Sequence, residues 1–330
     1  MMTLRLLIVL SIIMISCDER PTFHFGTTSD RLTRIIEWKE KLLVTANIGD
    51  LYSIDGDSLK EFKDDSIVNI NKCKNGYYAL RAPNDSTFIV VKPDNSEWLI
   101  KNKTGLKSEY FSVWTNEKCE ILLEYGMIAF KIQDNSFINM NKVYGFKDIT
   151  NFKASDRFGY FDNFIFLTKY ADYSGGGIFQ SYLDSDSNKY RLPNDIKVRD
   201  FTIHNDELWL VTGFYESNEG KDIVENKILK IRDGKIEEVV IKGIPHEMDI
   251  ASIYSNNTSM FLLSEKLGFF ELKDNGLNEL ISIDLRSSKI IPESFIVKDN
   301  LIFLATFENG ILRFTMKGKD FDIKQIVTSE

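Results

Sequence analysis

Short apolar segments recur along this chain and alternate with turns rich in Asn, Asp and Gly. Residues 41–56 (KLLVTANIGDLYSIDG) and 300–318 (NLIFLATFENGILRFTMKG) show the unit: an apolar strand, a polar turn, a second apolar strand and a charged turn. Residues 31–43 (RLTRIIEWKEKLL) fit a helix on spacing alone, but their alignment with the later segments predicts strand, turn and strand. Short apolar runs bounded by turn residues are typical of β-strands, so the pattern predicts an all-β fold.

The unit repeats at a regular spacing, with successive copies 35 to 52 residues apart. A period of about 40 to 45 residues that holds four short strands is typical of a β-propeller blade. The copies fill residues 31–330, which predicts one domain: a seven-bladed β-propeller of four-stranded antiparallel blades. The inner strands of the copies are expected to begin near Leu42, Tyr77, Ile121, Phe164, Leu208, Met260 and Leu301.

The fourth strands of the blades are faint in the sequence. Four of them are expected at residues 98–100, 236–240, 277–283 and 323–327. Because these strands are faint, six or eight blades stay open as alternatives. Two stacked β-sandwiches are the rival architecture, although sandwiches do not produce a regular period of this length.

One copy, LIFLATFENGILRF at residues 301–314, resembles the propeller repeat of two-component regulator sensors. That repeat reads Leu-Trp-apolar-Gly-Thr, then Asn-Gly-apolar, then an aromatic residue. The resemblance is clear in this copy, partial in three others and poor in the rest, and it implies a fold rather than an activity. Phe303 and Ala305 replace the Trp and Gly of the repeat, and its other positions are matched by Thr306, Asn309, Gly310 and Phe314.

The N-terminus reads as a processing signal. Arg5 is followed by an apolar stretch, residues 6–15, that is too short to span a bilayer. Residues 14–17, MISC, resemble the lipobox of bacterial lipoproteins, with Met14 in place of the usual Leu. The resemblance implies cleavage before Cys17 and a lipid on its sulfur. The alternative is an ordinary secretion signal with a cysteine at the cleavage point.

These observations divide the chain into three parts. Residues 1–16 are the predicted lipoprotein signal peptide, residues 17–30 the lipidated Cys17 with a polar tether, and residues 31–330 the propeller. Acyl chains on Cys17 would attach the protein to a membrane of the cell envelope, on the periplasmic side or at the cell surface. Together with the repeats, the lipobox makes the whole look like the propeller lipoproteins common in Bacteroidota.

The charge of the chain bears on its partners. The formal net charge is −8, and removal of residues 1–16 takes away only one charge, that of Arg5, which leaves −9. Nucleic-acid binding needs a basic surface, so the composition excludes nucleic acid as an expected partner. It also disfavours electrostatic adhesion to anionic lipid.

Two predicted turns between second and third strands are longer than the others: residues 169–178 (KYADYSGGGI) and 213–227 (GFYESNEGKDIVENK). Surplus loop length on a rigid scaffold often carries binding residues, and aromatic rings beside carboxylates suit sugar rings or peptides. The alternative is two flexible loops whose aromatic side chains fold back onto the blade edges. The candidate ligand-binding residues are Tyr170, Asp172, Tyr173, Phe179, Phe214, Tyr215 and Glu216.

One segment offers candidate metal ligands. Residues 244–249, IPHEMD, lie in a predicted blade-to-blade connection, so His246, Glu247 and Asp249 are candidates for a divalent-cation site at the channel mouth. The alternative is a solvated histidine beside acidic neighbours. No hydrolase elbow, zinc-protease helix or calcium-loop motif occurs. No catalytic residue or cofactor is therefore predicted, apart from the divalent cation of this alternative.

Two cysteines follow Cys17 in the chain, Cys73 and Cys119. Neither has a CxxC partner or a nearby histidine, so the sequence gives no support for a metal or redox site. In an exported chain the two can form a disulfide. Two separate, half-buried thiols are the alternative.

Taken together, the sequence favours a non-enzymatic binding or scaffold module tethered to the envelope. Its expected ligand is a glycan, a peptide or a partner protein. The alternative is a propeller hydrolase, lyase or lactonase with carboxylates or a metal ion in the central channel. The sequence does not separate a small ligand from a large partner that docks on the whole rim.

Overall fold

A computed structural model gives the fold of the chain. It describes residues 23–28, 32–38, 40–46, 51–62, 67–108, 111–125, 128–133, 136–139, 157–161, 164–171, 176–182, 198–218, 221–232, 235–245, 248–256, 258–273, 276–318 and 320–328. Every regular element in these residues is a β-strand. None of the described residues forms a helix long and apolar enough to cross a membrane.

The described strands follow one another in antiparallel groups. The first group contains β1 (Leu32–Trp38), β2 (Lys41–Ala46), β3 (Leu51–Asp55) and β4 (Ser58–Glu61). The second contains β5 (Ile67–Cys73), β6 (Gly76–Asn84), β7 (Thr87–Val91) and β8 (Glu97–Lys101). The third contains β9 (Ser112–Thr115), β10 (Ile121–Tyr125), β11 (Ile128–Gln133) and β12 (Ser136–Asn139).

The remaining groups continue the same order. The fourth contains the three described strands β13 (Arg157–Phe161), β14 (Phe164–Ala171) and β15 (Gly176–Tyr182). The fifth contains β16 (Val198–His204), β17 (Glu207–Asn218), β18 (Lys221–Arg232) and β19 (Lys235–Glu238). The sixth contains β20 (Ile250–Ser255), β21 (Met260–Ser264), β22 (Gly268–Lys273) and β23 (Gly276–Ser282). The last contains β24 (Pro292–Lys298), β25 (Leu301–Thr306), β26 (Ile311–Lys317) and β27 (Asp320–Thr328).

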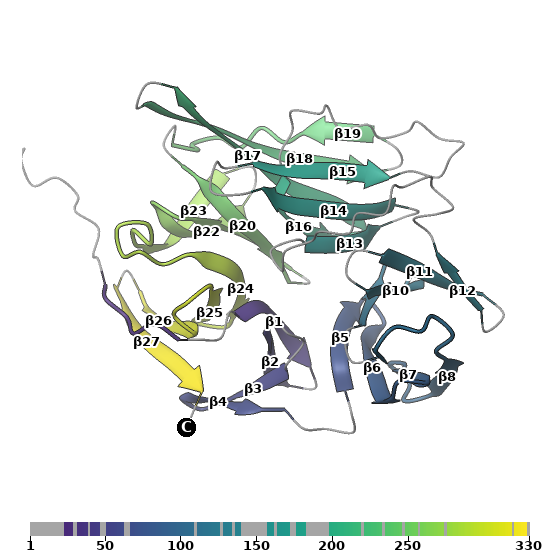
Figure 1. The fold of residues 1–330 in the computed structure, drawn as a ribbon. Coiled ribbons are helices and arrows are strands. Elements are labelled where there is room, and N and C mark those ends of the chain that lie inside the picture. Colours follow the sequence, from purple (N-terminus) through teal and green to yellow (C-terminus); the bar gives the residue numbers. More distant parts are fainter. Residues whose placement is uncertain are drawn as a thin grey trace, which may run out of the picture.

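The groups stand around a common centre, as Figure 1 shows. The first strands of neighbouring groups contact each other, from β1 through β5 and β9 to β13, and from β16 through β20 and β24 back to β1. The fourth group meets the fifth where β14 and β15 contact β16. This arrangement is a β-propeller of four-stranded antiparallel blades, as the sequence period predicts. Seven groups lie in the described residues, and the complete blade count stays a prediction.

The strand assignments from sequence need one correction. The apolar segments predicted as inner strands, such as those at Leu42 and Met260, are the second strands of their groups. The innermost strands come before them, because it is the first strands that contact each other around the centre. The fourth strands expected near residues 98–100, 277–283 and 323–327 are present as β8, β23 and β27, and β19 covers part of the expected 236–240.

Packing between neighbouring groups explains which strands are apolar. All five residues of β21 are buried, because both faces of a central strand are covered by adjacent groups. Phe269 in β22 contacts Phe295 in β24 and Phe314 in β26, with ring centroids 5.6 and 5.1 Å apart. The outer strand β27 instead alternates between exposed and half-buried residues along most of its length. Each large side chain buried in this way contributes about 1.5–3 kcal/mol.

Polar side chains tie successive first strands together. In three groups a polar residue near the start of the first strand, just after a shift of strand register, accepts a backbone N–H from a neighbouring group. The free edge of a first strand carries backbone groups that no ladder pairs, and these side chains satisfy part of them. The bonds run from Val113 N to Asn69 Oδ1, Ile253 N to Asp200 Oδ2 and Ile35 N to Ser294 Oγ, at 3.0, 3.0 and 3.1 Å.

The ring closes where the last group meets the first. β27 runs parallel to β4, with Val327 opposite Ser58, so the two groups form one eight-stranded sheet. Asp57, in the turn before β4, forms ion pairs with Arg313 at 2.9 Å and with Lys324. The outer strands therefore hold the first and last groups together in addition to the contact between β1 and β24.

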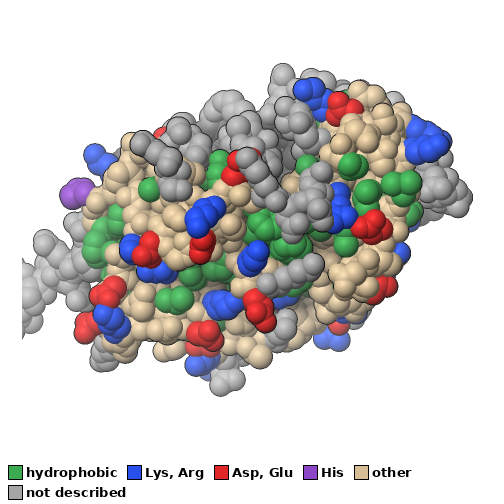
Figure 2. Space-filling view, turned by 90° about the horizontal axis from the view of Figure 1, so that it is seen from below, with side chains coloured by type: hydrophobic (Ala, Val, Ile, Leu, Met, Phe, Trp, Pro, Cys, Tyr) green, Lys and Arg blue, Asp and Glu red, His purple; other side chains and the backbone are tan. Residues whose placement is uncertain are grey.

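Charged side chains of both signs are mixed over the face seen in Figure 2, which views the molecule from below the orientation of Figure 1. Apolar side chains lie between them, and the described residues of that face form no large area with one sign of charge.

Residues 23–28, which we call the strap, pack against the last group. The Phe23 N–H donates to Ser288 Oγ at 3.0 Å, and the Thr28 N–H donates to the Glu308 carbonyl at 2.6 Å. The rings of Phe23 and Phe321 lie 6.0 Å apart. The sequence prediction assigned these residues to the tether, whereas their contacts join them to the folded domain. The rest of the predicted tether and the signal peptide lie outside the described residues.

Candidate functional site

The candidate ligand-binding residues belong to two long hairpins. Backbone pairing places Tyr170 opposite Gly177 in the β14–β15 hairpin and Tyr215 opposite Val224 in the β17–β18 hairpin. The prediction of long loops is wrong here, because aromatic and β-branched residues extend the strands toward each turn. Asp172 and Tyr173 lie outside the described residues. The predicted residues found in strands are Tyr170, Phe179, Phe214, Tyr215 and Glu216.

The β17–β18 hairpin extends well beyond its own sheet. The pairing of β17 with β16 ends at Thr212, opposite Val198, and the pairing of β18 with β19 begins only at Leu229. Backbone pairing between β17 and β18 nevertheless continues as far as Asn218, opposite Lys221, and Figure 1 shows the two strands running out together. We call residues 213–218 and 221–226 the arm. Among the described strands, none pairs with it as a third strand.

The arm occupies the place of a tight turn. In the last group, the Thr306 hydroxyl donates to the Gly310 carbonyl at 2.8 Å and closes a turn that contains only residues 307–309. In the fifth group, the Thr212 hydroxyl donates to the Lys227 carbonyl at 3.0 Å in the same way, with the whole arm between the two residues. The arm is therefore an insertion into a turn that the propeller scaffold closes without it.

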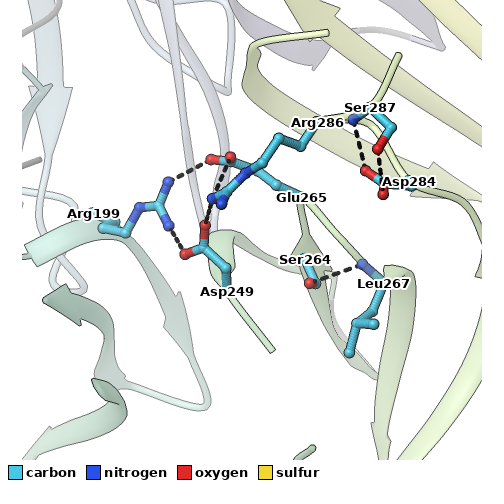
Figure 3. Close-up of polar contacts among 8 residues, drawn as sticks. All are labelled: Arg199, Asp249, Ser264, Glu265, Leu267, Asp284, Arg286 and Ser287. Carbon is cyan, nitrogen blue, oxygen red and sulfur yellow. Dashed lines mark hydrogen bonds and ion pairs between the residues drawn. The ribbon is translucent and has the colours of Figure 1, made fainter. Parts of the chain in front are cut away.

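Four charged side chains converge in Figure 3, and one of them, Arg199, follows the residue that pairs with Thr212 at the base of the arm. The guanidinium of Arg199 contacts Asp249 Oδ1 and lies 2.5 Å from Glu265 Oε1. Arg286 Nη2 lies 2.5 Å from Asp249 Oδ2 and 3.3 Å from Glu265 Oε2. Each carboxylate thus contacts both arginines, and the formal charges of the cluster cancel.

The surrounding turns hold these four residues, which we call the charge cluster, in place. The Ser264 hydroxyl accepts the Leu267 N–H at 3.1 Å and shapes the turn that carries Glu265. Asp284 accepts the Ser287 N–H at 2.8 Å and shapes the connection that carries Arg286. Both turns are therefore fixed by short-range hydrogen bonds of their own.

Burial sets the electrostatics of the charge cluster. The side chain of Asp249 is 3% exposed, whereas that of Arg286 is 33% exposed. Burial raises the pKa of the Asp249 carboxyl above its ordinary value, and the nearby Glu265 charge acts in the same direction. The positive charges of Arg199 and Arg286 oppose this rise. A buried carboxylate that contacts two arginines is well placed to join strand groups.

The charge cluster fixes the base of the arm. Arg199 follows Val198, which pairs with Thr212, the last residue before the arm. Asp249 immediately precedes β20, so the ion pair of Arg199 with Asp249 joins the fifth group to the sixth at this end of the sheets. The arm therefore starts from a position that the ion pairs of the buried Asp249 hold.

The predicted cation site rests on residues that the structure only partly describes. His246 and Glu247 lie outside the described residues, and both carboxylate oxygens of Asp249 contact arginines. A cation there would have to compete with two guanidinium groups for these oxygens. Among the described residues, no group of three or more His, Cys, Asp and Glu side chains is arranged to hold a metal ion.

A second polar region lies at the opposite ends of the first strands. His204 Nδ1 lies 2.7 Å from Ser255 Oγ, between the ends of β16 and β20. Lys298 forms an ion pair with Glu37 at 2.8 Å, between the ends of β24 and β1. Burial, together with the charge of Glu37, raises the pKa of Tyr254 to about 12, so its phenol stays neutral at physiological pH. These contacts join neighbouring groups.

A disulfide joins Cys73 to Cys119, with Cα atoms 5.7 Å apart. Cys73 ends β5 and Cys119 lies in the turn between β9 and β10, so the bond links the second group to the third. The separation is within the usual range for disulfides. Of the two alternatives that the sequence left open, the structure contains the paired one. Cys17 lies outside the described residues.

Sequence reasoning missed three members of the charge cluster, namely Arg199, Glu265 and Arg286. Arg199 and Asp249 are 50 positions apart, and nothing in their immediate neighbours marks them as partners. A signal was available in the repeat itself: Arg199 and Asp249 both stand at the start of a first strand. Aligning the copies on their first strands would have placed the two residues at the same end of adjacent blades.

Comparisons with known proteins support the fold. No protein-family model matches the chain, and no curated protein matches it. A GH74 xyloglucanase from Xanthomonas campestris is 10% identical over 93% of this chain and 55% of its own, with a TM-score of 0.51. The GH74 enzyme of Niastella koreensis is 9% identical over 92% of this chain and 55% of its own, with a TM-score of 0.52.

The WD40 β-propeller domain of Doa1 is a weaker match, 12% identical over 89% of this chain and 95% of its own, with a TM-score of 0.38. This chain spans about half the length of the two GH74 proteins. Identities near 10% indicate a shared fold and nothing about activity. The resemblance of one repeat to sensor propellers and the Bacteroidota-like lipoprotein interpretation stay expectations.

Proposed function

We propose that this chain is an exported, lipid-anchored β-propeller that binds a partner at the cell envelope through its arm, without catalysing a reaction. The partner is a glycan, a peptide or another envelope protein. One observation carries the proposal: the arm replaces a tight turn and projects from a base that the ion pairs of the buried Asp249 hold. A rigid scaffold that presents one extended element is a common design for recognition.

Export is supported by two features at different places in the chain. The lipobox-like residues 14–17 predict lipid attachment at Cys17. The disulfide between Cys73 and Cys119 suits an oxidising compartment, because cytosolic thiols are kept reduced. The lipid would hold the domain at the membrane, with its attachment leading into the strap.

The anchor is tested by Cys17→Ala in the native host. The variant is expected to accumulate with its signal peptide or to leave the membrane fraction, whereas Cys73→Ala should still be processed and retained. A Cys17→Ala protein that is normally processed and stays in the membrane fraction would contradict the anchor.

Binding is tested by placing a photoreactive amino acid at Tyr215, in the arm, and irradiating intact cells. The control site is Leu99 on β8, which is 61% exposed and belongs to the second group. A discrete covalent product is expected from the Tyr215 position only. Equal products from both sites, or none from Tyr215, would overturn the assignment of binding to the arm.

A hydrolytic enzyme is the second candidate, favoured by the buried Asp249 and by Glu265, two carboxylates that contact the same two arginines. Two carboxylates whose environments differ can divide acid and base roles, and a raised pKa suits the acid. The structurally similar Xanthomonas campestris protein is a xyloglucanase. The binding proposal predicts no release of reducing sugar from xyloglucan. Release that is lost in Glu265→Gln and in Asp249→Asn would favour the enzyme.

The last alternative is a site for a divalent cation, and the effect of metal ions on stability distinguishes it from the binding proposal. If His246, Glu247 and Asp249 hold a divalent cation, calcium or zinc should raise the melting temperature and EDTA should lower it, because a ligand of the folded state stabilises it. The binding proposal predicts the same melting temperature in all three conditions. A shift that Asp249→Asn abolishes would support the cation site.

A further inference from the structure

We propose that the arm binds an extended, basic peptide segment by adding it as a third β-strand. The inference rests on the proposed function in one respect, that the arm is the binding element. It goes further by choosing peptide over glycan and by naming the chemistry of the contact. The observations that carry it are the unpaired edges of the arm and its charge.

Among the described strands, none pairs with either edge of the arm. On one side, the ladder between β16 and β17 stops at Thr212. On the other side, the ladder between β18 and β19 includes no residue before Leu229. Along residues 213–218 and 221–226, the described strands therefore pair with the backbone on one side only, within the hairpin.

A two-stranded ribbon of this kind is an incomplete sheet. Isolated hairpins are marginal in water, and three or more strands are needed for independent stability. Exposed strand edges are templates for pairing, and proteins that bind peptides by strand addition use them in this way. The arm is attached to the propeller at one end only. A third strand would pair with backbone groups along one of its edges and so extend the sheet.

The spacing of edge groups favours a peptide over a sugar chain. Backbone donors and acceptors along a strand edge repeat with the period of a second extended backbone, about 3.3 Å per residue. An extended peptide matches this repeat over its whole length, whereas a glycan offers hydroxyl groups at other spacings. Main-chain pairing of this kind supplies affinity with little dependence on sequence.

The charge of the arm indicates what kind of peptide it binds. Residues 213–218 and 221–226 contain three acidic residues and one lysine. An acidic ribbon attracts a basic segment and repels an acidic one, with an effect that salt screens. The acidic residues are Glu216, Asp222 and Glu225.

The test measures binding of synthetic ten-residue peptides to the mature chain by fluorescence anisotropy. The probe alternates lysine and valine, which favours an extended conformation. One control peptide replaces each lysine with glutamate. A second control carries an N-methyl group at every residue, which removes the backbone donors and blocks strand pairing on both edges while keeping the charge.

Two protein variants locate the site. The first replaces residues 213–227 by Phe-Glu-Asn-Gly, the turn that the chain itself uses at residues 307–310. The second, Glu216→Lys with Glu225→Lys, keeps the arm and reverses charges on both of its strands. The second variant decides the question if the first fails to fold.

The basic peptide should bind the unaltered protein. Binding should be at least tenfold weaker when either protein variant is used, when the peptide is N-methylated, or when the buffer contains 0.5 M salt. The charge-reversed variant should gain binding of the glutamate peptide. Equal binding by the arm-replaced protein or by the N-methylated peptide would overturn strand addition. If no peptide binds while the Tyr215 cross-link persists, strand addition of a basic peptide is wrong and the proposed function stands.

Discussion

Asp200 accepts the backbone N–H of Ile253 at 3.0 Å, so a carboxylate in the fifth strand group satisfies the first strand of the sixth. Its Oδ2 also accepts the hydroxyl of Ser252. Asp200, Ser252 and Ile253 are 5, 3 and 4% exposed, so the carboxylate and both of its donors are shielded from water. Asn69 and Ser294 make the corresponding bond in other groups. The ring is therefore held by polar contacts at its centre as well as by apolar packing between blades.

The first prediction follows from this contact. Asp200→Ala leaves the Ile253 N–H and the Ser252 hydroxyl buried without their acceptor, which should lower the free energy of unfolding by about 1–3 kcal/mol. Asp200→Asn keeps one acceptor oxygen and should cost less. Urea unfolding of both variants measures the change in the free energy of unfolding. An Asp200→Ala protein as stable as the unaltered one would contradict a stabilising role for this contact between blades.

The second prediction compares two glycines with the same backbone conformation. Gly310 and Gly318 both have φ of +69°, but a Cβ on Gly310 would lie 2.6 Å from the Ile326 carbonyl oxygen, whereas one on Gly318 would meet nothing within 4 Å. Gly318→Ala should cost about 1 kcal/mol, the penalty of the left-handed conformation. Gly310→Ala adds a collision with backbone and should cost clearly more. Equal losses in urea unfolding would show that the close approach is unimportant.

The third prediction concerns alkaline pH. Burial raises the pKa of Tyr254 to about 12, against an ordinary value of 10.0. The folded state therefore holds this proton more tightly than the unfolded state. The stabilisation is complete below pH 10 and is lost as the pH rises toward 12. Stability of the unaltered protein should fall relative to Tyr254→Phe across that window, by up to about 3 kcal/mol. A difference that stays constant with pH would contradict the shift.

The fourth prediction concerns the disulfide between Cys73 and Cys119, which closes a loop with a sequence separation of 46. A cross-link over a loop of this size restricts the unfolded chain and commonly contributes about 2–4 kcal/mol. Dithiothreitol should therefore lower the urea midpoint of the unaltered protein. It should leave the Cys73→Ser, Cys119→Ser double variant unchanged. An unaltered midpoint in both proteins would indicate that the bond contributes nothing to stability.

The sequence revealed the second strands of the blades because neighbouring groups cover both of their faces. β21 is buried along its whole length and reads as the unbroken run MFLL. The outer strand β27 is covered on one side for most of its length and alternates, so its sequence signal is weaker. The periodicity of apolar residues therefore reports which strands are buried. It located the strands along the chain correctly, but it did not show which strand of each blade lies nearest the centre.

The candidate site was harder to predict for physical reasons. Chain length at 213–227 correctly marked an excursion from the scaffold, but an insertion of strand-forming residues continued the ladder and did not form a loop. The pairing of Arg199 with Asp249 depends on contact between two blades that are far apart in sequence. Such pairings follow from the closed ring, which a single sequence specifies only once its repeats are aligned.

The central claim is that the arm is the element that meets the partner. Hydrogen–deuterium exchange of the full mature chain, with and without the lysine–valine peptide, tests it most directly because exchange reports backbone hydrogen bonding residue by residue. The account predicts slower exchange at amides within residues 213–218 or 221–226 when the peptide is bound, with the four-stranded blades unchanged. Protection at another strand edge, with the arm amides unaffected, would contradict it.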